Sequence, residues 1–266
     1  MLQFIMYFRY REVLNLRDEK SAGIKGVIRG MERSALMSLI CLVFAVAYPT
    51  SALLGHGIMM VIFRLVASLS FVAAGVIAYI TGSKNGAYGK MVIAGLAAGA
   101  VGDMCSDLNS EVKIIICMCF LTVGNILYIL AFGRANKIMP LQFLIGVLLG
   151  GGAAFYLWIT CGPAHGKFFP LAAVYCLLSA FTAGGAVCVA VYKRQVRLSA
   201  IVCAAGTVLL MLGGVVLLYV LLADSKNIKA LNYVAALLHY PGQLCIGLSL
   251  LDEPVGLQEE GKANGR

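Results

Sequence analysis

A few side chains that can do acid, base or anion-binding chemistry lie within the apolar stretches of this protein. Asp103 stands in the run 92–104, which otherwise holds only small and apolar residues. A carboxylate within hydrocarbon is costly, so we interpret Asp103 as a functional candidate that can donate or accept a proton. The other polar candidates within apolar runs are Arg64, Asn125, Tyr128, Tyr175, His239, Tyr240 and Gln243.

The composition excludes a water-soluble globule. Of the 266 residues, 61% are hydrophobic and only 12% are charged, and the mean hydropathy is +0.91. Such values are typical of a polytopic membrane protein. Runs of about 20 apolar residues predict an all-α bundle of eight transmembrane helices. The predicted spans are 35–54, 57–81, 87–106, 112–132, 138–160, 168–192, 198–223 and 228–251.

The distribution of positive charge predicts the orientation of this bundle. Lys and Arg are enriched in cytoplasmic loops, and alternate loops hold most of the 21 Lys and Arg residues. The opposite side holds only Lys113, Lys167, Lys226 and Lys229. We therefore expect both termini to be cytoplasmic, and the membrane to be the bacterial inner membrane if the source is prokaryotic. The net charge of +9 then reflects topology and attraction to anionic headgroups, so no nucleic acid partner is expected.

The two ends differ from the membrane domain, which we assign to residues 34–251. Residues 1–33 interleave aromatic and aliphatic side chains with Arg and Glu, a pattern typical of an interfacial amphipathic helix. They lack the apolar core and cleavage site of a signal peptide. The alternative is that translation starts at Met31. Residues 252–266 are polar and acidic and are expected to form a disordered tail.

The cysteines and histidines do not form a recognisable metal site. No C-x-x-C occurs among the nine cysteines, and the three histidines are scattered. We expect neither a metal nor another cofactor, and we interpret the cysteines as small packing residues. A disulfide between Cys105 and Cys161 remains an alternative. Small residues four apart, as in Gly95/Gly99 and Gly146/Gly150, predict close helix contacts.

Arg64 and Asp103 are expected to face one another. At about 1.5 Å per residue, Arg64 lies roughly 10 Å and Asp103 roughly 6 Å inward from the same membrane face. Two opposite charges at matching depth on consecutive helices are natural partners. We predict an ion pair or a shared hydrated pocket, and a purely structural bridge is the alternative.

A second group of polar residues falls nearer the middle of the membrane. His239 and Gln243 are four residues apart, and therefore lie on one face of the last predicted helix. Together with Asn125, Tyr128 and Tyr240 they are expected to line a polar cavity. The alternative is that they serve as hydrogen-bonding contacts between helices.

Four stretches give the chain a family resemblance. They are AGLAAGAVGD at 94–103, FLTVGNILY at 120–128, the Val-Tyr pair ending at Tyr175, and residues 233–249 with their Tyr-x-x-Gln and following Ser. In order and position they resemble the YhhN-like lysoplasmalogenase family, over roughly residues 64–251. The resemblance implies an eight-span membrane hydrolase. Such enzymes cleave the vinyl ether bond of lysoplasmalogens, which releases a fatty aldehyde and a glycerophospho-alcohol.

Vinyl ether hydrolysis needs an acid that protonates the enol ether carbon and a base that activates water. The resemblance implies that Asp103 is the first of two catalytic Asp residues. The second is expected in a Ser-Asp pair on the seventh span, where this chain has Gly213 and Gly214. A His-x-x-Tyr expected on the fourth span is replaced by Asn125-Ile-Leu-Tyr128.

Two residues are candidates for the missing catalytic group. Asp107 follows Asp103 by four residues and shares its helical face, although it also fits a solvated loop. His239 is the other candidate base, although it also fits an interior hydrogen-bonding role. The expected substrate contacts are Arg64, Asn125, Tyr128, Tyr175, Tyr240 and Gln243.

Three functions remain compatible with the sequence. The first is hydrolysis of a lysoplasmalogen or related lysophospholipid, and the second is binding of such a lipid without catalysis. The third is transport through a pathway that contains Arg64 and Asp103, against which no internal repeat or pair of interrupted helices is evident. The expected partners are membrane lipids, while the headgroup and the oligomeric state are left open.

Overall fold

The protein is a bundle of long helices, and the computed structural model contains no strand in any residue that it describes. The described residues are 21–82, 86–105, 111–135, 140–161, 168–192, 198–222 and 228–251. Helices suit this sequence because each one satisfies its backbone hydrogen bonds internally, as a bilayer requires. The predicted all-α class is therefore confirmed.

The long helices follow one another along the chain with short connections. They are α2 (Ser21–Leu53), α3 (Gly57–Gly82), α4 (Gly86–Cys105), α5 (Glu111–Ala135), α8 (Phe169–Tyr192), α9 (Leu198–Leu222) and α10 (Ile228–Leu248), which ends in the 3-10 turn η3 (Ser249–Leu251). Between α5 and α8 a further helical rod consists of α6 (Pro140–Ile145), the π-helical η1 (Gly146–Gly150) and α7 (Gly151–Cys161).

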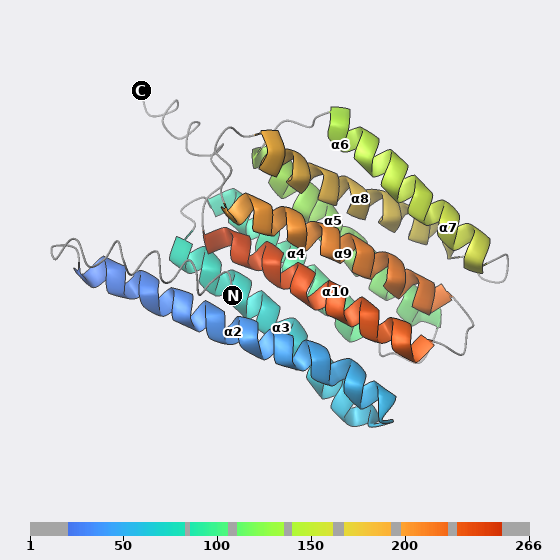
Figure 1. The fold of residues 1–266 in the computed structure, drawn as a ribbon, viewed down its shortest axis with the longest axis horizontal. Helices are drawn as coiled ribbons and strands as arrows, with labels where there is room; N and C mark the ends of the chain where they lie inside the picture. The colour runs from blue at the N-terminus through green and yellow to red at the C-terminus, as the bar shows by residue number, and fades with distance from the viewer. Residues whose placement is uncertain are drawn as a thin grey trace.

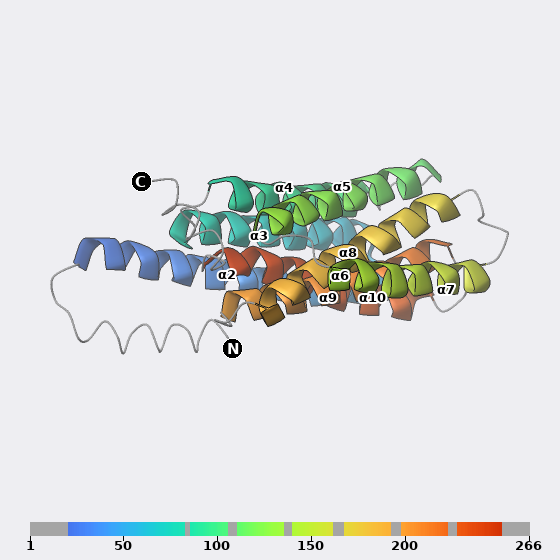
Figure 2. The same ribbon diagram turned by 90° about the horizontal axis from the view of Figure 1, so that it is seen from above.

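Seven of these helices form a closed ring. In chain order α2, α3, α4, α5, α8, α9 and α10 each contact the next, and α10 returns to contact α2. The rod formed by α6, η1 and α7 packs mainly on α8, at the opposite margin of the bundle from α2 (Figures 1 and 2). Helix α10 also contacts α3 and α4. It is therefore the helix best placed to carry side chains into the interior of the ring.

Seven helical segments among the described residues are long and apolar enough to cross a membrane. Helix α4 is the eighth long segment and lies between α3 and α5. It is not among the seven, and it contains Lys90, Asp103 and several glycines. The structure thus gives eight helical segments where eight spans were predicted, and seven of the eight meet the requirement for a span on composition alone.

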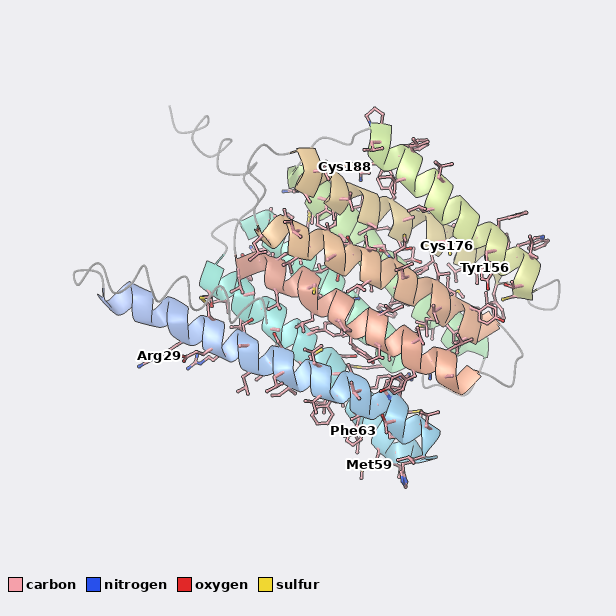
Figure 3. All side chains as sticks on the ribbon, in the orientation of Figure 1. Arg29, Met59, Phe63, Tyr156, Cys176 and Cys188 are labelled. Carbon is pink, nitrogen blue, oxygen red and sulfur yellow. The ribbon has the colours of Figure 1, made fainter. Side chains whose placement is uncertain are left out.

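The outer surface of the bundle is apolar. Large hydrophobic side chains such as Ile58 and Ile80 are largely exposed, which is expected where lipid replaces water. Only 22% of the most apolar part of Pro140–Cys161 is buried, compared with 61% for the corresponding part of Phe169–Val191. Side chains such as Met59 and Tyr156 mark this periphery in Figure 3.

Helix α2 begins before the predicted first span. It starts at Ser21 and so includes the second half of the basic segment 1–33. Its buried residues recur every three or four positions, which turns one face towards α3 and α10. They include Ser34, Ser38, Cys41, Ala45 and Tyr48. Residues 1–20 and the predicted tail 252–266 lie outside the described residues.

Small residues allow the helices to approach closely, as predicted. A Cβ atom added at Gly95 would lie 2.5 Å from the ring of Tyr128, and one at Gly150 would lie 2.7 Å from the Cα atom of Leu177. All nine cysteines are free thiols. The alternative of a disulfide between Cys105 and Cys161 is therefore wrong; these residues end α4 and α7, which do not pack on one another as neighbours.

Candidate functional site

A small polar cavity lies inside the ring, and five helices contribute to it. Its volume is about 30 Å³, which is enough for a water molecule but far less than a lipid requires. The lining residues are Tyr48 from α2, Arg64 from α3, Asp103 from α4, Leu217 from α9, and Asn232, Ala235, Ala236, His239 and Tyr240 from α10. Three of the predicted site residues with ionisable side chains, Arg64, Asp103 and His239, therefore meet at one cavity.

Asp103 is buried and held from three sides. Its Oδ2 atom accepts a hydrogen bond from the Ser68 hydroxyl at 2.9 Å, and its Oδ1 atom lies 3.2 Å from Nε2 of His239. Its main-chain oxygen accepts a hydrogen bond from Nη1 of Arg64 at 3.3 Å. The side chain is thus fixed against the wall of the cavity, next to a second group that can carry a proton.

His239 is buried, and its imidazole lies next to the carboxyl group of Asp103. The distance of 3.2 Å is that of an ion pair, although the imidazole N–H is not aligned for a hydrogen bond. The Nδ1 atom is buried and has no hydrogen-bond partner among the described residues. A carboxyl group and an imidazole at this distance can exchange a proton, so the pair combines a potential acid with a potential base.

Arg64 is held by aromatic and polar groups of the cavity wall. Its Nη2 atom donates a hydrogen bond to the hydroxyl of Tyr48, and its Cζ atom lies 4.4 Å from the centre of the Tyr48 ring. The same hydroxyl accepts a hydrogen bond from Nδ2 of Asn232 at 3.3 Å. These contacts offset part of the desolvation of a guanidinium group in the membrane domain.

The local sequence explains how these groups converge. Arg64 and Ser68 are four residues apart and therefore share one face of α3, which is the face that meets the end of α4. The predicted proximity of Arg64 and Asp103 is confirmed, and the contact runs through the main-chain oxygen of Asp103. The two residues also line the same cavity, as the prediction of a shared pocket requires.

A second polar contact lies one helical turn along α10 from His239. The Tyr128 hydroxyl donates a hydrogen bond to Oε1 of Gln243 at 2.6 Å, and both side chains are buried. Helix α4 makes room for this pair, since Cβ atoms added at Gly95 and Gly99 would lie 2.5 Å from Tyr128 and 2.7 Å from Gln243. The pair joins α5 to α10 behind the cavity, which is the role of a hydrogen-bonding contact between helices.

Asn125 and Tyr175 form a third polar group. The Nδ2 atom of Asn125 donates to the main-chain oxygen of Leu121 at 3.1 Å. The Oδ1 atom of Asn125 and the hydroxyl of Tyr175 are buried without a hydrogen-bond partner among the described residues. Neither residue lines the cavity that contains Asp103.

Tyr175 also explains why glycine is required on α9. A Cβ atom at Gly214 would collide with the hydroxyl and lie 2.8 Å from Cε1 of Tyr175. A carboxylate at position 214 would therefore need the Tyr175 ring to move. A Cβ atom at Gly213 would lie 2.9 Å from the main-chain nitrogen of His239. At both positions where the resemblance implies a Ser-Asp pair, the local packing favours glycine.

Three further residues of the site were not predicted from the sequence: Tyr48 and Asn232, which line the cavity, and Ser68, which donates a hydrogen bond to Asp103. Tyr48 and Asn232 lie near the ends of predicted spans, where aromatic and amide side chains are common. Ser68 resembles any small interhelical hydroxyl, although its spacing of four from Arg64 could have marked it. Asp107, the other candidate for the missing group, lies outside the described residues.

Comparison with known proteins agrees with this architecture. Residues 59–250 match the YhhN family. The chain belongs to the YhhN family. No curated protein and no solved structure matches it. The match includes Arg64, Asp103 and His239, whereas Tyr48 lies on the N-terminal side of the matched residues.

Proposed function

We propose that this YhhN family member is an integral membrane hydrolase that cleaves the vinyl ether bond of lysoplasmalogen-type lysophospholipids. The proposal includes the eight-span architecture with both termini in the cytoplasm. The observation that carries it is the buried pair of Asp103 and His239, with Oδ1 and Nε2 atoms 3.2 Å apart at a cavity that has room for water. This pair supplies the two proton-transfer groups that the reaction needs, without a second Asp.

In the proposed reaction Asp103 is the acid. Its protonated carboxyl group gives a proton to the vinyl ether carbon that does not bear oxygen, which leaves an oxocarbenium ion at the neighbouring carbon. The Ser68 hydroxyl, 2.9 Å from Oδ2, stabilises the carboxylate that the transfer leaves behind.

His239 is the base of the second step. It accepts a proton from the water that adds to the oxocarbenium carbon, which gives a hemiacetal. The hemiacetal collapses to a fatty aldehyde and the glycerol hydroxyl, so that one water is consumed and no proton is gained or lost overall. Transfer of the proton from the imidazolium to Asp103 across 3.2 Å restores the starting state.

Two of the remaining polar residues, Arg64 and Tyr240, are assigned to the substrate. Arg64 suits the headgroup phosphate, since guanidinium groups bind phosphates through paired N–H donors. Tyr240 lines the same cavity and is assigned to the glycerol region. Tyr128 and Gln243 are bonded to one another, and we assign them a positioning role behind the reacting groups.

Lipid binding without catalysis is the second candidate function. The resemblance implies a catalytic carboxylate at position 214, where this chain has glycine. Because Tyr175 fills the space beside Gly214, the absence of that carboxylate favours binding without catalysis. Transport is less well supported, because the cavity has a volume of only about 30 Å³ and the sequence shows no internal repeat.

The test is to supply the purified protein with a vinyl ether lysophospholipid and to follow the release of aldehyde. The parent protein is expected to release aldehyde, and the Asp103→Asn variant is expected to release none. If a folded parent binds the lipid and releases no aldehyde, the hydrolase proposal is wrong and the binding function stands.

A further inference from the structure

The Asp103 cavity is too small for a lipid in this structure, so one wall must move before a lipid can react there. A volume of about 30 Å³ corresponds to the space of a water molecule. The wall that moves would determine from which side the substrate arrives. The two seams that α10 forms beside the cavity, with α9 and with α2, differ in their contacts.

The seam between α9 and α10 is closed by backbone packing. A Cβ atom at Gly206 would lie 2.8 Å from the main-chain oxygen of Gly242, and one at Gly242 would lie 2.8 Å from the main-chain nitrogen of Leu210. Helices in such close contact cannot separate without losing packing along their whole length. This seam is therefore an unsuitable entrance.

The seam between α2 and α10 is closed at the cavity by side chains. Tyr48 is the only α2 residue that lines the cavity, and across it α10 presents the small residues Ala235 and Ala236. The Tyr48 ring lies edge-on to Tyr240, with ring centres 6.2 Å apart. Its hydroxyl is bound by Arg64 and by Asn232. Movement of one ring and loss of these contacts would open the cavity on this side.

Both helices contain a proline directly after the tyrosine in question. Pro49 follows Tyr48 within α2, and Pro241 follows Tyr240 within α10. Each proline removes a main-chain hydrogen bond and favours a bend at that turn. In α2 the Ser51 hydroxyl donates to the main-chain oxygen of Tyr48 at 2.7 Å, a type of contact that also bends helices. The two tyrosines thus stand at the two positions where these helices bend most easily.

The outside of this seam is the lipid-facing surface. Val43 and Val46 on α2 and Val234 and Leu237 on α10 are exposed apolar side chains, and Figure 1 shows α2 alongside α10 at one margin of the bundle. A single-chain amphiphile in the bilayer would lie against this surface, with its polar end at the depth of Arg64.

We propose that Tyr48 and Tyr240 form a lateral gate, through which a lysophospholipid enters the Asp103 cavity from the bilayer between α2 and α10. Tyr48 is also the positioning residue that holds Arg64 while the gate is closed. The gate rests on the proposed lysophospholipid substrate. It gives a functional role to α2, a helix that precedes the residues matched to the YhhN family.

The test locates the bound lipid without relying on catalysis. The protein in nanodiscs is mixed with an ester-linked choline lysophospholipid that carries a diazirine in its acyl chain, and is irradiated at short times after mixing. Competition identifies the specific adducts, which excess lysophospholipid suppresses and excess diacyl phospholipid does not. These adducts are mapped by mass spectrometry. We expect these adducts in α2 and α10, on peptides that flank Tyr48 and Tyr240. Suppressible adducts confined to other helices, such as α5 and α8, would overturn the gate.

Variants of the gate give a second, independent readout. Tyr48→Ala removes the ring and both hydrogen bonds and is expected to raise the early yield of α10 adducts about tenfold, while Tyr48→Phe, a milder change for the fold, raises it about threefold. Phe44→Ala is the matched control, because Phe44 is an aromatic residue of the same helix that packs on Phe63 outside the cavity. If both Tyr48 variants label α10 at the rate of the parent and of Phe44→Ala, the gate is refuted.

The hydrolysis assay separates the two proposals. Suppressible adducts at the α2–α10 seam in a parent that releases no aldehyde would support the entrance and refute the hydrolase. Release of aldehyde by a parent whose suppressible adducts lie in other helices would support the hydrolase and refute the entrance. The Asp103→Asn variant is expected to label like the parent, because the gate does not depend on the acid.

Discussion

Replacement of His239 by glutamine is the most direct test of the proposed pair. Glutamine places an uncharged N–H donor near Oδ1 of Asp103, which lies 3.2 Å from the imidazole Nε2 atom. It cannot accept a proton from water. The perturbation therefore removes the base while leaving a polar group in the same buried position.

The size of the effect follows from the role assigned to the imidazole. General acid or base catalysis typically contributes about 10²- to 10⁴-fold to a rate, which corresponds to about 3 to 5 kcal/mol of activation free energy. We expect His239→Gln to lower kcat for aldehyde release by this factor, with little change in lysophospholipid binding. Because Asp103 and His239 act in one proton circuit, the double variant Asp103→Asn/His239→Gln should be about as slow as the slower single variant.

The assay measures aldehyde release in nanodiscs and lipid binding on the same preparations. His56→Gln is the matched control, since His56 is an exposed residue in the connection between α2 and α3 and should leave both quantities unchanged. The reasoning is refuted if His239→Gln hydrolyses the substrate within about threefold of the parent rate. Rate losses that multiply in the double variant would refute the shared proton circuit.

Three further predictions concern packing and topology. Gly214→Ala is expected to destabilise the protein by about 1 to 3 kcal/mol, because the added methyl group collides with Tyr175. Thermal unfolding in detergent measures this loss. The control Gly152→Ala, at an open position, should unfold at the temperature of the parent. Tyr128→Phe leaves Oε1 of Gln243 without its 2.6 Å hydrogen bond, so a loss of about 1 to 3 kcal/mol is expected in the same assay; an unchanged unfolding temperature would show that water replaces the hydroxyl. Reporter fusions at either terminus are expected to report the cytoplasm, and a C-terminus on the other side would mean an odd number of spans.

The sequence alone determined the class of the protein and which polar groups lie within its long helices. Hydrocarbon imposes helices on any chain this apolar, so the all-α fold and the approximate bounds of the long helices followed from composition and periodicity. The contact between Arg64 and Asp103 was also predictable, because their helices are consecutive and a fixed rise per residue sets both side chains at similar depth. The resemblance to the YhhN family rested on local strings and agrees with the match over residues 59–250.

Only the tertiary structure decided which residues share the cavity. His239 reaches Asp103 because α10 closes the ring against α2, α3 and α4, and helices distant in sequence meet through packing that no local pattern encodes. For the same reason Tyr48 was missed, and Tyr175 proved to lie against Gly214 rather than in the cavity. Periodicity specifies which face of a helix is buried. The neighbour that this face meets is determined by how all the helices pack together.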